Sequence, residues 1–233
     1  MALSKRIKTI KEKIDVIKDY DIEEAIELLK SAPKVKFNES VDLSVNLGID
    51  ATKSDQGVRG SSTLPHGIGK NMNVVAFADG EDEKAAKDAG ADTVGFEDLI
   101  EKVKKDKDLV ADIVVATPDC MKKMGQLGRI LGPKNLMPNP KEGTVTKNVA
   151  DAVGNAKKGQ IRYKTDKAGI IHATVGKIDF AAQKLEENIQ YLIEDLIKAK
   201  PSTAKGKYMK NITLSSTMGP GIRVDLASVE RRS

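Results

Sequence analysis

Two short segments combine residue types that suit contact with a nucleic-acid backbone. Lys36 and Phe37 come just before a predicted strand, and residues 217–223, Thr-Met-Gly-Pro-Gly-Ile-Arg, follow another. Glycine and small side chains let a sugar–phosphate backbone come close, and the Thr217 hydroxyl can bond a 2′-OH or a phosphate. Met218 can pack on a sugar or a base face. Phe37 and Met218 could instead be core residues, but their position beside lysines favours a surface role.

Another candidate anion site, residues 122–141, is rich in glycine, proline and cations. Backbone amides freed by glycine, next to cations, form an anion-receptive surface. The alternative is a structural Ω-type loop that only closes the fold around it. The glycines are Gly125, Gly128 and Gly132, and the cations are Lys122, Lys123, Arg129, Lys134 and Lys141.

Cysteine and histidine, two residue types that often act in catalysis and metal binding, are scarce. Cys120 is the only cysteine, so a disulfide framework and a multi-cysteine zinc site are excluded. No histidine partner is indicated for Cys120, and we expect an inert thiol. His172 shares a predicted strand face with Ile170 and Thr174, without a second ligand nearby in the sequence. We therefore expect no metal, no cofactor and no enzymatic activity.

Periodicity predicts the outer elements of the chain. Isoleucines at 7, 10, 14 and 17 predict a first helix, and Asp21 with Glu24 has the spacing of a capping box that opens a second. Apolar and polar residues alternate over 41–47, as in a half-buried strand. The later outer elements are strands at 160–165 and 169–175 joined as a hairpin through 166–168, a long helix capped by Asp179, and a strand at 211–216.

The middle of the chain has a different pattern, in which short apolar runs alternate with helical stretches. This alternation predicts a parallel sheet covered on both faces, a small doubly wound, Rossmann-like α/β domain. The predicted strands are 73–77, 91–94 and 112–116, and the predicted helices are 81–88, 97–105 and 148–157.

Neither set of outer elements can close a core alone, whereas together they make a split β-α-β layer with extra helices. We therefore expect a discontinuous domain, 1–67 and 159–233, with an inserted domain, 68–158. Residues 66–70, His-Gly-Ile-Gly-Lys, lack the spacing of a phosphate loop, so Gly67, Gly69 and Gly159 are interpreted as a hinge. The alternative is two consecutive domains, 1–110 and 111–233, which would split the alternation of the middle.

The charge is concentrated near the end of the chain. The net charge is +5, and over residues 200–233 seven cations face only two carboxylates. Such a surface attracts phosphate, although a solvated lysine-rich surface explains the charge equally well. These cations are Lys200, Lys205, Lys207, Lys210, Arg223, Arg231 and Arg232.

Composition excludes further classes of protein. Four Phe, four Tyr and no Trp argue against a platform of several stacking rings for single-stranded bases. No stretch approaches 18 uncharged apolar residues, and the N-terminus lacks an apolar leader core. We expect a cytoplasmic protein without a membrane partner.

Three motifs in this order resemble the family of the large-subunit ribosomal protein L-one, the stalk protein, in its bacterial form. They are Val58 to Lys70 (VRGSSTLPHGIGK), Gly125 to Pro140, and Thr217 to Gly221 (TMGPG). The resemblance runs essentially from end to end. It implies an α/β fold in which a discontinuous split β-α-β domain of α+β type carries an inserted three-layer α/β domain on a hinge.

The resemblance also implies a function and partners. Family members bind a helix-and-loop region of large-subunit ribosomal RNA through the discontinuous domain and form a mobile stalk of the large ribosomal subunit. They help transfer RNA leave the exit site, and they repress translation of their own operon by binding its messenger RNA. The RNA-contacting residues that it implies here are Lys36, Phe37, Ser40, Asp166, Lys167, His172, Ser215, Thr217, Met218 and Gly219.

Two other functions remain as alternatives. An enzyme that binds a nucleotide in the middle domain would need a glycine-rich fingerprint after residues 73–77, but Ala78-Asp-Gly-Glu81 offers one glycine and two acids. A protein–protein scaffold without RNA would bind its partner without the steep salt dependence of phosphate neutralisation.

Overall fold

The computed structural model describes residues 10, 14–15, 18–32, 35–53, 55–106 and 108–230. The first predicted helix lies mostly outside the described residues, as do Arg231 and Arg232. The chain divides into two compact units, unit 1 (residues 1–69 and 161–233) and unit 2 (residues 70–160). The predicted division into a discontinuous RNA-binding domain, 1–67 and 159–233, and an inserted domain, 68–158, stays a prediction.

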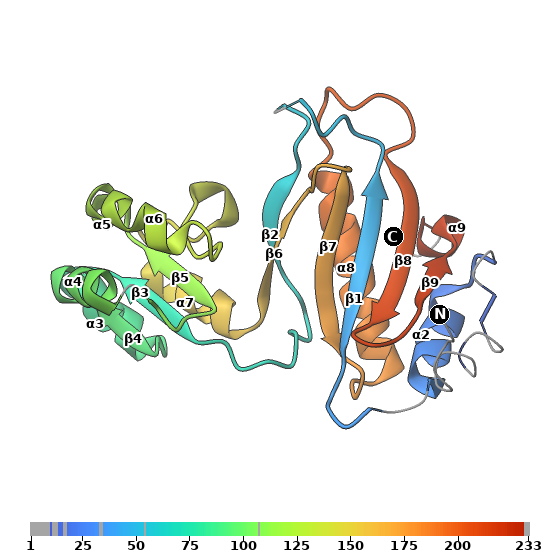
Figure 1. Ribbon diagram of the computed structural model, residues 1–233, viewed down its shortest axis with the longest axis horizontal. Coiled ribbons are helices and arrows are strands. Elements are labelled where there is room, and N and C mark those ends of the chain that lie inside the picture. Colours follow the sequence, from blue (N-terminus) through green and yellow to red (C-terminus); the bar gives the residue numbers. More distant parts are fainter. Residues whose placement is uncertain are drawn as a thin grey trace. The chain divides into compact units, whose positions relative to one another are not determined.

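Unit 1 is built on a four-stranded antiparallel sheet of order β7-β1-β8-β9 (Figure 1). Its strands are β1 (Ser40–Leu47), β7 (Ile170–Lys177), β8 (Met209–Ser216) and β9 (Gly221–Val224). Helix α8 (Ala182–Lys198) joins β7 to β8, which lie on either side of β1. This is the predicted split β-α-β arrangement, and the expected α/β fold class is confirmed.

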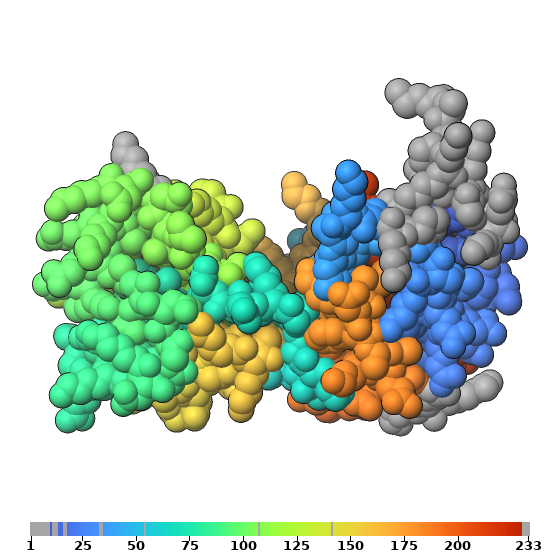
Figure 2. Space-filling view, turned by 90° about the horizontal axis from the view of Figure 1, so that it is seen from below, coloured from blue at the N-terminus to red at the C-terminus, as the bar shows by residue number. Residues whose placement is uncertain are grey.

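The helices that the structure describes cover only one face of this sheet. Helix α2 (Ile22–Ser31) and α8 pack against each other, and Figure 2 shows their blue and orange atoms adjoining. Alternate residues of β1, from Val41 to Leu47, are buried against them, as the period-two pattern predicts. In Figure 1 no described helix lies in front of the strands, so the opposite face, here the open face, carries the polar half of the alternation.

A small second sheet in unit 1 differs from the prediction. Strand β6 (Gln160–Lys164) pairs with β2 (Arg59–Thr63), and only a bridge between Thr165 and Ile171 remains of the predicted hairpin. Strand β2 has no apolar alternation, because its buried positions are Gly60 and Ser62. A Cβ at Gly60 would lie 2.8 Å from the Tyr163 hydroxyl, so the absence of a side chain there makes room for the tyrosine.

Two predicted helix caps are wrong. Asp21 stands at the N-cap of α2, but its side chain makes no capping hydrogen bond. Helix α8 begins after Ala181 rather than at Asp179, because residues 177–180 form a turn in which the Phe180 amide donates to the Lys177 carbonyl (3.0 Å). The last helix, α9 (Leu226–Glu230), follows β9.

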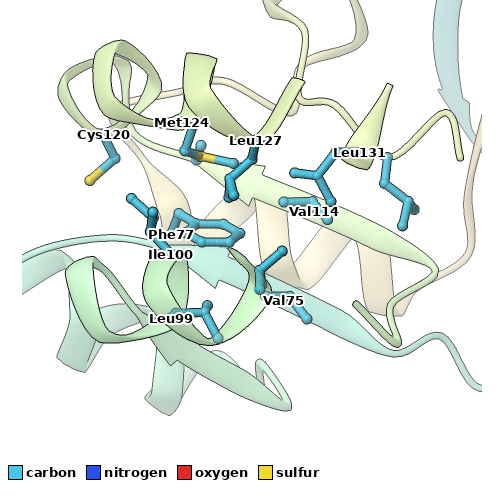
Figure 3. Packing of buried hydrophobic residues seen from close by; sticks show 12 residues of the cluster. Val75, Phe77, Leu99, Ile100, Val114, Cys120, Met124, Leu127 and Leu131 are labelled. Carbon is cyan, nitrogen blue, oxygen red and sulfur yellow. The ribbon is translucent and has the colours of Figure 1, made fainter. Parts of the chain in front are cut away.

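Unit 2 is the predicted parallel sheet with helices on both faces. Its strands have the order β4-β3-β5, and alternate residues of β3 enter two cores. Val74 and Ala76 pack toward α3 and α7, whereas Val75 and Phe77 face α4 and α5. Figure 3 shows Phe77 among residues of that second core. The elements are β3 (Val74–Phe77), α3 (Glu81–Asp88), β4 (Thr93–Gly95), α4 (Glu97–Asp106), β5 (Ile113–Ala116), α5 (Pro118–Met124) and α7 (Val149–Lys157).

The glycine-rich segment of unit 2 begins as helix rather than loop. Turn η1 (Gly125–Leu127) and helix α6 (Gly128–Leu131) continue α5, because Met124, Leu127 and Leu131 bury one face at helical spacing. The Gly132 amide donates to the Gly128 carbonyl (2.9 Å), so it is not available to an anion. The interpretation of these glycine amides as an anion-receptive surface is therefore wrong. A last short turn is η2 (Pro140–Glu142).

Candidate nucleic-acid interface

Three segments of unit 1 meet at the end of the sheet where β1 begins and β8 ends. The Thr217 amide donates to the Ser40 carbonyl (3.1 Å), and the Ser40 amide donates to Thr217 Oγ1 (3.0 Å). These two bonds extend the pairing of β1 with β8 past the last strand residue. The Thr217 hydroxyl is thus held by the backbone of Ser40, and its first effect is to fix the loop that follows.

A buried carboxylate holds the tip of that loop. Glu39 is 2% exposed, and its Oε1 accepts a hydrogen bond from the Met218 amide (2.9 Å). The Gly219 amide donates to the Ser216 carbonyl (3.0 Å) and closes the turn. A Cβ at Gly219 would lie 2.3 Å from Ser216 Oγ, so a side chain there would force the buried Ser216 hydroxyl to move. Glu39 gives no signal in the sequence that separates it from a solvated acid, and it was not predicted.

Two apolar side chains are exposed at this end of the sheet, Met218 on the fixed loop and Phe37 just before β1. Met218 is 56% exposed and Phe37 is 53% exposed. A hollow of about 430 Å³ lies beside Phe37, between residues 35–39 and 178–179, with Lys30 and Lys36 in its lining. Lys30 Nζ donates to the Phe180 carbonyl, and Lys36 forms no ion pair within the described residues. Apolar surface next to such a cation suits a sugar or base face whose phosphates lie nearby.

The open face of the sheet continues from this end and carries small polar side chains. The Thr174 hydroxyl donates to Asp42 (2.6 Å), Lys177 Nζ donates to Ser40 Oγ (2.9 Å), and Ser215 lies beside Asp42 in the register of β1 and β8. The residues of this face are Ser40, Asp42, Ser44 and Asn46 of β1, His172 and Thr174 of β7, and Thr213 and Ser215 of β8.

His172 is an exposed member of the open face. Its Nδ1 lies 3.1 Å from the Ser44 hydroxyl, and its Nε2 lies 3.7 Å from a carboxylate oxygen of Asp166. Both partners orient the ring across the face, where either nitrogen can serve a hydrogen bond. Among the described residues no group of three or more His, Cys, Asp and Glu side chains is arranged to hold a metal ion.

Asp166 and Lys167 lie at the opposite end of the sheet from Thr217. Asp166 Oδ1 accepts hydrogen bonds from the amides of Ala168 and Ile170, each 2.8 Å, and the bond from Ile170 is the main reason that the pKa of Asp166 lies below its ordinary value. The carboxylate shapes the turn and leaves Lys167 exposed. Six residues of β1 separate the two ends, about 20 Å along the strand.

The predicted contact residues therefore form two groups joined by the open face. Lys36, Phe37, Ser40, Ser215, Thr217, Met218 and Gly219 gather at one end, Asp166 and Lys167 lie at the other, and His172 lies between. None of their RNA contacts is tested by this geometry, and each stays a prediction. The three glycines interpreted as a hinge all have positive φ, namely 64° at Gly67, 72° at Gly69 and 95° at Gly159.

Unit 2 has its own hollow, at the carboxyl ends of β3 and β5. It measures about 630 Å³ and is lined by Asp79, Asp82 and Asp119, which would repel a nucleotide phosphate at the position where doubly wound folds bind one. Two lysines, Lys123 and Lys147, also line it, and Lys123 is paired with Glu97, so the acids outnumber the cations. Burial raises the pKa of the Cys120 thiol, the opposite of what an activated nucleophile requires.

Comparison with known proteins identifies the family. The profile of the Ribosomal protein L1p/L10e family matches residues 28–220. The proteins named large ribosomal subunit protein uL1 from two strains of Vibrio vulnificus are 56% identical to this chain over 231 residues, which cover 99% of each sequence. Among the described residues, no helix has the length and apolar character needed to cross a membrane. The resemblance drawn from the three motifs is thereby confirmed, and the chain is a member of the ribosomal protein L1 family in its bacterial form.

Proposed function

We propose that this chain is a structural, non-enzymatic component of the large ribosomal subunit that acts in the cytoplasm and binds large-subunit ribosomal RNA through unit 1. Membership of the family and the names of the two Vibrio proteins support the ribosomal assignment. The RNA partner is a helix-and-loop region that forms the mobile stalk of the subunit.

The single observation that carries this proposal is the fixed, exposed loop of Thr217 to Gly219. Met218 is more than half exposed on a backbone held by Ser40 and by the buried Glu39. A rigid apolar tip costs little conformational entropy to dock, and it lies at the end of a face of hydroxyl groups. RNA of fixed tertiary shape can be gripped by such backbone and hydroxyl contacts with few stacking rings.

The second part of the proposal gives the two units separate roles. The compact units support a discontinuous RNA-binding domain and an inserted domain over two consecutive domains. We assign a hinge to the junctions that contain Gly67, Gly69 and Gly159, where positive φ values come naturally to glycine. Movement of the inserted domain on this hinge would help transfer RNA leave the exit site.

The third part is translational repression. A messenger RNA of the protein's own operon that mimics the ribosomal site would be bound by the same surface of unit 1, so the two RNAs would compete. Competition is testable because the ribosomal fragment, when in excess, should displace a labelled messenger fragment completely. Simultaneous binding of both RNAs would require a second surface and would refute this part.

The experiment that tests the proposal is a filter-binding titration of the full chain. The probes are a stalk-region fragment of large-subunit ribosomal RNA and a scrambled hairpin of the same length, each at two salt concentrations. We expect tight, salt-dependent binding to the stalk fragment and at least about 1,000-fold weaker binding to the scrambled hairpin, by analogy with specific nucleic-acid complexes. Equal binding to both probes would mean that the chain attracts only charge.

A further inference from the structure

The end of the sheet opposite Thr217 carries a group of cations that no part of the proposed function uses. Lys207 precedes β8, Lys210 lies near the start of β8, and Arg223 lies near the end of β9. The pairing of β1 with β8 is irregular here, since Asn46 pairs with Asn211 but Leu47 pairs with Met209. Lys210 is the extra residue of this irregularity and is exposed, as a bulged residue often is.

These three side chains line one hollow of about 390 Å³. None of them forms an ion pair with any residue that the structure describes, unlike Lys70, Lys123 and Lys157 of unit 2. Two carboxylates, those of Asp19 and Asp225, also line the hollow, and Asp225 Oδ1 accepts the Ala227 amide (3.0 Å). The three cations therefore exceed the two carboxylates by one positive charge, and their N–H groups remain available to an anion.

Arg223 connects this hollow with the open face. In the register of the sheet, His172, Ser44, Thr213 and Arg223 occupy one row across the four strands. Ile222 and Val224, on either side of Arg223, are buried under the helices, so Arg223 projects from the open face. Three strand spacings, about 14 Å, separate it from His172. An RNA that covers the open face reaches this row without leaving the sheet.

We propose that Lys207, Lys210 and Arg223 form a phosphate-binding site that grips the backbone of the bound RNA at a second point, remote from Met218. The inference rests on the proposed RNA binding by unit 1 and adds to it a ligand class, the phosphodiester, and a place. Phosphate contacts fix position and affinity but do not read sequence. The site therefore strengthens binding to every RNA by a similar factor and leaves discrimination to the other end of the sheet.

The test measures affinity against salt concentration for two variants of the full chain, Arg223→Gln and the double variant Lys207→Gln/Lys210→Gln. Each phosphate contact that is lost makes the slope of log K against log salt concentration shallower by about 0.7–0.9. We expect the magnitude of this slope to decrease by about 0.7–0.9 in Arg223→Gln and by about 1.5 in the double variant. The ratio of affinities for the stalk fragment and the scrambled hairpin should not change.

Lys184→Gln is the matched control. Lys184 is an exposed cation without an ion partner among the described residues, but it lies on α8, which covers the other face of the sheet. Its slope should equal that of the unchanged chain. A salt slope that stays the same in both test variants, while the unchanged chain still prefers the stalk fragment, overturns the phosphate site and leaves the proposed function standing. Loss of that preference in the unchanged chain refutes both.

Discussion

Several lysines of unit 2 are paired with carboxylates, whereas the cations at the two ends of the unit 1 sheet are not. In unit 2, Lys70 lies 2.6 Å from Asp112, Lys157 lies 2.7 Å from Asp92, and Lys123 and Lys134 are paired with Glu97 and Asp108. In unit 1, Lys36, Lys167, Lys207, Lys210 and Arg223 form no ion pair within the described residues.

This difference teaches that the number of lysines says little about anion binding. Surface ion pairs contribute only about 0–1 kcal/mol each to stability, but they cancel the field that a distant phosphate would feel. Unpaired cations keep that field, and they release counterions when an RNA arrives. The segment 122–141 is the clearest case, since three of its five cations, Lys122, Lys123 and Lys134, are paired.

The largest expected effect tests the exposed apolar tip. Met218→Asp should weaken binding of the stalk fragment by about 100-fold, because it removes an apolar contact and places a negative charge beside phosphate. Val110→Asp is the matched control, since Val110 is 81% exposed but lies in unit 2. Filter binding measures the affinity of both variants for the stalk fragment. An equal loss of affinity in the two variants would contradict the assignment of RNA binding to unit 1.

A smaller loss is expected when the loop is released without touching its surface. Glu39→Ala should weaken RNA binding by about ten-fold, because the Met218 amide loses its acceptor and the loop loses its fixed conformation. Glu39→Gln should restore most of the affinity, since an amide oxygen also accepts. A loss as large in Glu39→Gln as in Glu39→Ala would show that charge, rather than positioning, is what Glu39 provides.

Thr217→Val removes the acceptor of the Ser40 amide and keeps the shape of the side chain. We expect the loss in affinity for the stalk fragment to be several-fold, about 1 kcal/mol, and Thr217→Ser to bind normally. The circular dichroism of both variants should match that of the unchanged chain. Thr217→Val with full affinity would mean that the bond to Ser40 does not position the loop.

The smallest effect concerns acid, which should weaken unit 2 through its ion pairs. The hydrogen bond from Lys70 holds the pKa of Asp112 below its ordinary value of 3.8. Hydrogen bonds from their own paired lysines likewise lower the pKa values of Asp92, Glu97 and Asp108. A carboxyl group whose pKa is lowered in the folded state stabilises the fold at pH values above its ordinary pKa. This stabilisation is lost as the pH falls below the ordinary pKa and through the lowered one.

Cys120 reports on this acid response because it is the only cysteine and is 2% exposed within unit 2. Its labelling by 4,4′-dithiodipyridine, relative to the rate in urea at the same pH, should rise several-fold between pH 5 and pH 3. Asp112→Asn should label faster at pH 5 and respond less to acid. The same pH response in both proteins would exclude Asp112 as a contributor.

Elements that are defined by the burial of their own side chains can be predicted from the sequence. Elements whose formation depends on contacts with residues far away in the sequence cannot. The alternation of 41–47 and the apolar run of 112–116 predict β1 and β5 because burial of side chains alone defines them. Strand β2 was missed, since Gly60 and Ser62 are buried by Tyr163 and Asp195, which lie far away in the sequence. Glycine content alone suggested a loop at 125–132, where the spacing of Met124, Leu127 and Leu131 makes helix.

The candidate site shows the same division. Phe37, Thr217 and Met218 were predicted from residue type and place, and the resemblance to the family added His172, Asp166 and Lys167. The separation of these residues into two ends of one sheet depends on strand register, which no motif contains. Glu39 and Arg223 gain their importance only from their neighbours in the fold, a buried loop amide and a shared row of the sheet.

The most direct test of the central claim, that RNA binds unit 1 through its unpaired cations, compares two double variants of the full chain. Lys36→Gln/Lys167→Gln neutralises cations of unit 1, and Lys122→Gln/Lys123→Gln neutralises paired cations of unit 2. We predict that the salt slope for the stalk fragment becomes shallower by about 1.5 in the first variant and is unchanged in the second. An equal change in both, or a change in the second alone, would contradict the account.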